Sequence, residues 1–137
     1  MPASSRGPWL RVAILVGIAY FLIGRAFARP TDHLHAWRLA AWFVSGVSYA
    51  AHIWYEHFRL RNSPRATASH VALAVAIGAM ALAMAGMIHS LSIRAAIRPV
   101  WLLALVAWPF MTALPAFLVA LVAGVLLPKP TIRENAE

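Results

Sequence analysis

The sequence predicts an all-α protein, an integral membrane four-helix up-down bundle with short connections. Three observations lead to this fold class: the composition, four long apolar segments, and the short polar stretches between them. The chain has 137 residues, of which 62% are hydrophobic and 12% charged, and its mean hydropathy is +0.72. A soluble domain is about 45–50% apolar and about 25% charged. We therefore expect a lipid bilayer around a single transmembrane domain that covers residues 1–137.

Four apolar segments follow one another along the chain, each about as long as the ~20 residues that a membrane-spanning helix needs. We expect helices at about 8–28, 35–58, 67–93 and 99–127, with a solvated tail at 128–137. Because only a few residues connect them, consecutive helices should be antiparallel neighbours. Pro30, Pro64 and Pro99 lie between the segments, where a missing N–H removes no helical hydrogen bond.

The charge pattern bears on partners and orientation. The chain carries a net charge of +8, but its basic residues flank the apolar runs, which argues for lipid headgroups and against nucleic acid. Seven Lys and Arg residues lie on the side of the N-terminus and five on the other. The positive-inside rule then predicts a multi-pass protein of a bacterial-type inner membrane with both termini in the cytoplasm. The lack of cysteine excludes disulfides, thiolate metal sites and cysteine nucleophiles.

The second segment carries one polar stripe at helical spacing. It contains Arg38, Ser45, Ser48, His52, Glu56 and Arg59. Polar groups that face lipid are costly, so this stripe should face the bundle interior or a partner. One interpretation is a line of groups that handles protons or ions from the cytoplasmic face. The other is a set of hydrogen bonds that holds helices together, with Glu56 paired to Arg59.

The third and fourth segments carry packing features. Small residues of the third segment, which let helix backbones approach closely, form one stripe with Ala72, Ala76, Ala79, Ala83 and Gly86, and a second stripe with Ala74 and Gly78 beside it. We therefore expect this helix at the centre of the bundle. Pro109 and Pro115 lie inside the fourth segment and predict kinks, with Thr112 placed to satisfy a carbonyl that one of them frees.

Six histidines raise the question of haem b, which helix bundles bind between two histidines. His52 and His70 lie at a similar depth in neighbouring segments and are the candidate ligands. The small residues of the third segment argue against them, because backbones that pack closely leave no space for a macrocycle. The expected cofactor is therefore none, with haem b as the lesser alternative. The sequence predicts no metal site.

The sequence contains no recognisable catalytic machinery. It lacks a glycine-rich phosphate loop and an HExxH motif, although a His–carboxylate couple such as His52 and Glu56 suffices for general acid–base chemistry. We expect a small polytopic membrane protein that acts as an accessory subunit of a membrane complex or as a homo-oligomer. Its partners would be lipid and other membrane helices. The alternatives are a compact oligomeric transporter or channel that uses the polar stripe, and a b-type haem protein.

Overall fold

A computed structural model describes residues 7–28, 34–92 and 99–128, and this part of the chain is helical, as predicted. Helix α1 covers Gly7–Ala26 and α2 covers Leu34–Trp54. A short π-helix, η1, continues α2 over Tyr55–Arg59. Helices α3 and α4 cover Pro64–Ser92 and Pro99–Leu126. The expected tail after residue 128 and most of the connections at 29–34 and 94–98 lie outside the described residues.

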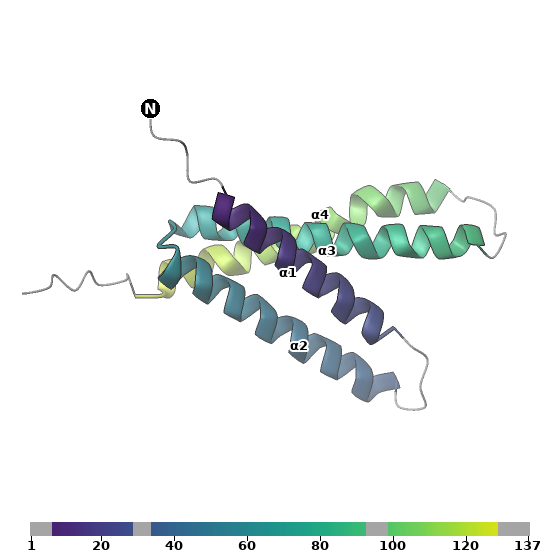
Figure 1. The fold of residues 1–137 in the computed structure, drawn as a ribbon, viewed down its shortest axis with the longest axis horizontal. Coiled ribbons are helices and arrows are strands. Elements are labelled where there is room, and N and C mark those ends of the chain that lie inside the picture. The colour runs from purple at the N-terminus through teal and green to yellow at the C-terminus, as the bar shows by residue number, and fades with distance from the viewer. Residues whose placement is uncertain (1–6, 29–33, 93–98, 129–137) are drawn as a thin grey trace, which may run out of the picture.

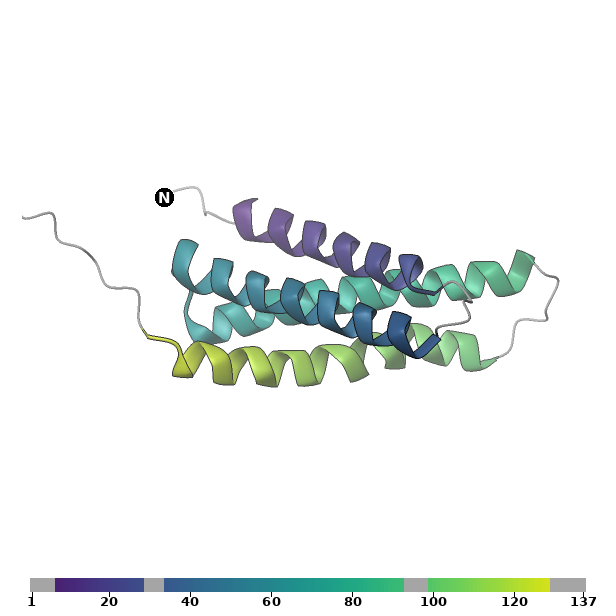
Figure 2. The ribbon, with the colours of Figure 1, turned by 90° about the horizontal axis from the view of Figure 1, so that it is seen from below.

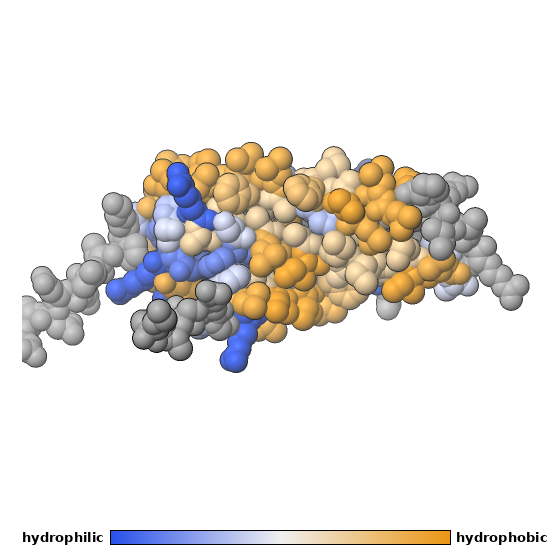
Figure 3. Space-filling view, turned by 90° about the horizontal axis from the view of Figure 1, so that it is seen from above, coloured by the Kyte–Doolittle hydropathy of each residue, from blue (hydrophilic) through white to orange (hydrophobic). Residues whose placement is uncertain are grey.

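Three of the four helices are long and apolar enough to cross a membrane. The candidate spans are Pro8–Ala26, Pro64–Ser92 and Leu102–Leu126. Helix α2 is not among them, because polar and charged side chains interrupt its apolar sequence. Hydrophilic side chains gather toward the end of the molecule at which α3 begins, whereas apolar side chains cover most of the rest of the face in Figure 3.

Helix α3 has the most extensive contacts in the fold. It lies beside α4 along much of its length and crosses α1 on another side (Figures 1 and 2). Helix α2 lies next to α1 but diverges from α3 and α4 toward its N-terminal end (Figure 1). It joins them near its C-terminus, where Ile53 packs into a core cluster with Ala68, Val71 and Ala120. Tyr49, one turn earlier, donates a hydrogen bond to the carbonyl of Ala116.

Helices α1 and α3 approach each other closely at two glycines, Gly17 and Gly78. A Cβ on Gly78 would lie 2.7 Å from the Cβ of Tyr20 and 3.0 Å from the carbonyl oxygen of Gly17. Gly17 in turn faces the carbonyl of Ala74. The second small-residue stripe of α3, which contains Ala74 and Gly78, therefore makes the tight crossing.

The first small-residue stripe has a more mixed environment. Ala79 is buried, whereas Ala83 and Gly86 are half-buried. Ala72 and Ala76 instead line an apolar groove of about 530 Å³ between α3 and α4, with Pro109 and Phe110 opposite them. The small side chains of this stripe leave space between the two helices at that level.

Pro64, which was expected between two helices, is the first residue of a helix. Helix α3 begins at Pro64 and not near residue 67. Ser63 precedes it as a cap, because its Oγ accepts a hydrogen bond of 3.3 Å from the N–H of Ala66. Helix α4 begins at Pro99, which is also where the fourth helix was expected to begin. Proline is favourable at this position because its ring fixes φ near the helical value. It also lacks the N–H, which at the first helical position would have no carbonyl partner within the helix.

Both internal prolines lie inside α4, where the kinks stay a prediction. The hydroxyl of Thr112 donates to the carbonyls of Trp108, at 2.9 Å, and Pro109, at 3.1 Å. The prolines free the carbonyls four residues before them, which are those of Leu105 and Met111. The expectation that Thr112 satisfies one of these was therefore wrong, because a threonine in a helix reaches its own i−4 and i−3 carbonyls.

Candidate functional site

The chain reverses direction after α2 through η1 and a tight turn, which bring Glu56 and Asn62 together. In η1 the N–H of Leu60 donates to the carbonyl of Tyr55 at 3.1 Å, five residues back. Such π turns are rare and frequently occur at functional sites. Arg61 then adopts a positive φ of 52°, and the N–H of Asn62 donates to the carbonyl of Glu56 at 3.2 Å. A residue in the left-handed conformation directly after the last turn is a common way for a helix to end. The turn folds Asn62 back over Glu56.

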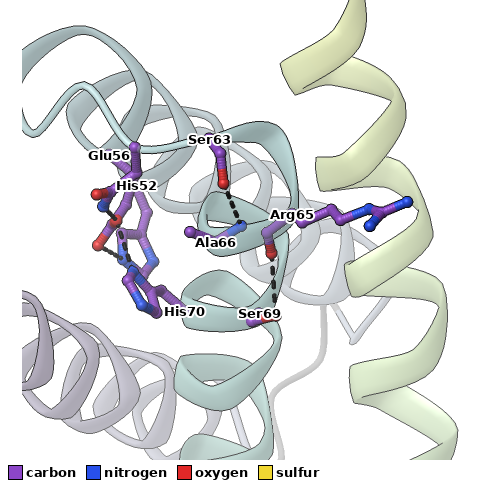
Figure 4. Close-up of polar contacts among 8 residues, drawn as sticks. His52, Glu56, Ser63, Arg65, Ala66, Ser69 and His70 are labelled. Atoms are coloured by element: carbon purple, nitrogen blue, oxygen red, sulfur yellow. Dashed lines mark hydrogen bonds and ion pairs between the residues drawn. The ribbon is translucent and has the colours of Figure 1, made fainter.

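Glu56 is the centre of a polar cluster, and its side chain is fully buried. Its Oε2 accepts a hydrogen bond from Nδ2 of Asn62 and lies 2.8 Å from Nδ1 of His70. Its Oε1 lies 3.6 Å from Nε2 of His52, one helical turn earlier. Figure 4 shows His52 and His70 on α2 and α3 turned toward the carboxylate. We call His52, Glu56, Asn62 and His70 the Glu56 centre.

A tryptophan of α1 completes the surroundings of the Glu56 centre. The indole ring of Trp9 stacks on the imidazole of His70, with 4.1 Å between ring centroids and 6° between ring planes. The side chain of His70 is 16% exposed, whereas those of His52 and Glu56 are fully buried. The cluster therefore connects α1, α2, η1 and α3 at one end of the molecule.

Several buried polar atoms of the Glu56 centre have no hydrogen-bond partner among the described residues. They are both ring nitrogens of His52 and Oε1 of Glu56. A buried polar atom without a partner typically costs about 1–3 kcal/mol, and protein interiors satisfy most of them. The side of the centre that faces His52 thus retains unused hydrogen-bonding capacity.

The electrostatics of Glu56 follow from its neighbours. Burial raises the pKa of its carboxyl group, but the nearby imidazole of His52, the hydrogen bonds from His70 and Asn62, and the positive charge that His70 can carry together outweigh this effect. The pKa of Glu56 is therefore lower than its ordinary value. Glu56 lies in η1, outside the three candidate spans. Its carboxylate form is the stable one at neutral pH.

Arginine does not neutralise this carboxylate within the described part of the chain. The ion pairs of Glu56 there are with His52 and His70. Arg59 and Arg61 are exposed, and the side chain of Arg65 points away from the centre toward α4 in Figure 4. The expected pairing of Glu56 with Arg59 was wrong, because the π turn leaves Arg59 at the surface while Glu56 faces α3.

The predicted polar stripe of α2 changes character along the helix. Arg38 is exposed and Ser45 is half-buried. Ser48 is also half-buried and donates to the carbonyl of Val44, four residues before it, at 2.9 Å. Of the stripe, His52 and Glu56 are buried, and Arg59, its last member, is exposed. The buried carboxylate therefore lies between two exposed ends of the stripe.

The candidate haem ligands His52 and His70 do lie close together, but a carboxylate separates them. Each ring has a nitrogen directed at a different oxygen of Glu56. This geometry favours a network centred on the carboxylate over ligation of a haem by two histidines. Among the described residues, no group of three His, Cys, Asp or Glu side chains is arranged to hold a metal ion.

A second histidine of η1 lies on another side of the same turn. His57 is buried, and its Nε2 donates to the carbonyl of Pro128, after the end of α4, at 3.2 Å. A cavity of about 450 Å³ lies beside it, lined in part by Arg61, Pro64 and Gly124. His57 thus joins the end of α2 to the end of α4, while Glu56 joins it to α3.

Sequence reasoning missed two members of the site. The sequence patterns considered above singled out neither Trp9, near the start of the first apolar segment, nor Asn62, in the connection after the second. A usable sequence signal for Asn62 was its place shortly after Glu56, where helix-ending turns bring polar side chains back over the last turn. The sequence alone carries no signal that pairs Trp9 with His70.

Comparisons with known proteins add no assignment. No family model, no curated protein and no solved structure matches the chain.

Proposed function

We propose that this chain is an integral membrane protein that acts by association, as an accessory subunit of a membrane complex or as a homo-oligomer. In this proposal its four helices cross a bacterial-type inner membrane in up-down order. Both termini and the connection before α3 lie in the cytoplasm. The partners are lipid and other membrane helices.

The observation that carries the proposal is the uncovered state of α2. This helix is too polar to count as a candidate span by itself, yet its own chain covers it least. Leu39, Trp42 and Phe43 are 70%, 80% and 73% exposed, and α2 contacts α3 and α4 mainly near its C-terminus. Because lipid does not satisfy polar groups, a helix with half-buried serines is better accommodated against protein. A partner helix on α2 would supply that environment.

Native mass spectrometry of the protein extracted in mild detergent tests the association. We expect multiples of the 15.0 kDa chain or one stable complex with a second membrane protein. A chain that is purely monomeric at every detergent concentration would contradict the proposal.

Cysteine cross-linking locates the interface. Trp42→Cys in α2 should form a cross-link under mild oxidation, to another copy or to the co-purified partner. Phe110→Cys in α4 is the matched control, because Phe110 is 74% exposed and Trp42 is 80% exposed. Equal cross-linking at both positions would indicate random collision and would contradict an interface on α2.

Thiol labelling on intact cells tests the proposed orientation. Ser63 precedes α3 and Ser92 ends it, so cysteines at these two positions report on opposite ends of one helix. With an impermeant reagent we expect labelling of Ser92→Cys and protection of Ser63→Cys. The reverse pattern would invert the topology, and labelling of both would show that α3 does not cross the membrane.

A compact oligomeric transporter or channel is the second candidate function. The polar line in α2 that ends at buried His52 and Glu56 favours it. His52→Gln keeps a hydrogen-bonding side chain but does not titrate near neutral pH, so it should abolish transport while the protein still folds. His35→Gln, at the exposed beginning of the same helix, is the control. A His52→Gln protein that folds, assembles and complements a deletion strain would eliminate this candidate.

A further inference from the structure

We propose that the Glu56 centre is a proton-binding site in which His70 and Glu56 form a permanent ion pair and His52 takes up one further, exchangeable proton. The ligand is a proton from the aqueous side of the membrane at this end of the bundle. This inference does not depend on how the chain assembles.

The first step concerns the charge balance of the centre. An isolated buried carboxylate is strongly disfavoured unless it is paired and hydrogen-bonded. Glu56 is fully buried, and the partners of its carboxylate in the described structure are two imidazoles and the neutral amide of Asn62. The charges that lie nearest in sequence, at Arg59 and Arg61, are exposed and make no ion pair with it within the described chain. One imidazole must therefore be protonated for the centre to be neutral.

The second step identifies His70 as that cation. Its Nδ1 lies 2.8 Å from Oε2 of Glu56, which is the length of a charge-assisted hydrogen bond. Its ring also lies flat on the indole of Trp9 at 4.1 Å, and a tryptophan face attracts a cation within about 6 Å. Its partial exposure lets water solvate the remaining N–H. Each of these three contacts stabilises imidazolium more than imidazole.

The third step identifies His52 as the group with free capacity. Its ring is buried, and neither nitrogen has a hydrogen-bond partner within the part of the chain that the structure describes. Its Nε2 lies 3.6 Å from Oε1 of Glu56, which is also unpartnered. A proton on Nε2 would place a donor opposite this acceptor, and a shift of about half an ångström would bring the pair to the usual hydrogen-bond distance.

The charged and titratable groups around His52 determine how favourable its protonation is. Glu56 of η1 favours a charge on His52, whereas His70 of α3, once protonated, opposes it. His57, the other histidine of η1, has its Nε2 committed to the carbonyl of Pro128. When a proton adds to the lone pair of His52, the total charge of His52, Glu56 and His70 rises from zero to +1. The site therefore binds the proton reversibly, without a covalent change in the protein.

Nitrogen-15 NMR of the full-length, histidine-labelled protein in lipid nanodiscs tests the proposal, because imidazole and imidazolium nitrogens have clearly separate chemical shifts. The signals are assigned by correlation experiments on the wild type, so the protonation state of each histidine is measured without any variant that would have to fold. At pH 7 we expect His70 as imidazolium and His52 as a neutral ring. As the pH falls, His52 should convert reversibly to imidazolium while the protein stays folded.

Two results would overturn the proposal. The first is a neutral His70 at pH 7 in the folded wild type, and the second is a His52 that stays neutral until the protein unfolds. Glu56→Gln adds a direct check, since removal of the carboxylate should abolish the imidazolium signal of His70 at pH 7. The exposed histidines His35 and His89 are internal controls, because their signals should not change in that variant.

Discussion

Glu56→Gln is the substitution that probes the site most directly, because it keeps the shape of the side chain and removes its charge. In the wild type, Oε2 of Glu56 receives hydrogen bonds from Asn62 and His70. A hydrogen bond to a charged group contributes about 1.5–3 kcal/mol and one between neutral groups about 0.5–1.5 kcal/mol. Each of the two bonds should therefore weaken by roughly 1–1.5 kcal/mol. We expect the free energy of unfolding to fall by about 2–3 kcal/mol.

This figure lies below the 3–5 kcal/mol that is typical when one partner of a buried ion pair is removed. The reason is that the side chain of His70 is 16% exposed, so it can release its proton to water when the carboxylate is absent. In Glu56→Gln the folded protein therefore does not retain an unpaired positive charge on His70. Glu56→Leu, which also removes the oxygen acceptors, should reduce stability further than Glu56→Gln.

The assay is reversible unfolding of the protein in mixed micelles at several pH values. The pKa of Glu56 is lower in the folded protein than its ordinary value of 4.5, so the carboxylate stabilises the fold fully above pH 4.5 and loses its effect as the pH falls through the lowered value. The stability difference between wild type and Glu56→Gln should therefore be largest near neutral pH and shrink in acid.

Ser48→Ala is the control for this experiment. Ser48 lies in the same polar stripe, but its hydroxyl donates to a carbonyl of its own helix and to no other element in residues 7–28, 34–92 and 99–128, so its removal should change stability by less than about 0.5 kcal/mol. If Glu56→Gln is as mild as Ser48→Ala, or if its effect is the same at acidic and neutral pH, the carboxylate is not held by the pairing described here.

Three further predictions concern the backbone and can be measured by the same unfolding assay. Gly78→Ala should destabilise the protein by about 1–3 kcal/mol, because its Cβ would meet α1 at 2.7 Å, whereas Gly46→Ala, with nothing within 4 Å, should stabilise it by up to about 1 kcal/mol. Arg61→Gly should be about 1 kcal/mol more stable than Arg61→Ala, since only glycine adopts a φ of 52° without strain. Ser63→Ala should cost about 0.5–2 kcal/mol through loss of the cap, and Ser69→Ala, inside the helix, close to nothing.

The helices could be predicted from the sequence because each depends on a long local run of apolar residues. The ends of the helices depend on single residues that can either break or begin a helix, so the ends were predicted less accurately. Pro64 was interpreted as a break, whereas the serine before it makes it a favourable first residue of α3. The π turn at the end of α2 could not be predicted, since the side chains of Tyr55–Arg59 do not distinguish it from a final α-helical turn.

The packing of α3 depends on tertiary structure that the local sequence pattern does not determine. Two stripes of small residues lie side by side on this helix, and both fit the requirement for close approach. The structure uses Ala74 and Gly78, because Gly17 of α1 lies opposite them. Gly17 in α1 is a sequence signal for close packing, but only the crossing angle of α1 and α3 decides which stripe of α3 meets it. The same limit applies to the Glu56 centre. The proximity of His52 and Glu56 follows from i,i+4 spacing, whereas the contact with His70 requires the fold.

The position of the Glu56 centre explains why a buried charge there has consequences beyond its local cost. An apolar replacement of a buried ion pair often stabilises a protein by as much as the pair does, so packing alone does not require a carboxylate at this point. Helix α2, however, is held to α3 mainly at its C-terminal end, where Glu56 bonds to His70 and Ile53 enters the core. A proton taken up by His52 changes the charge at that attachment. The exposed part of α2, which carries Trp42 and Phe43, should therefore be the part of the molecule whose position responds most to protonation.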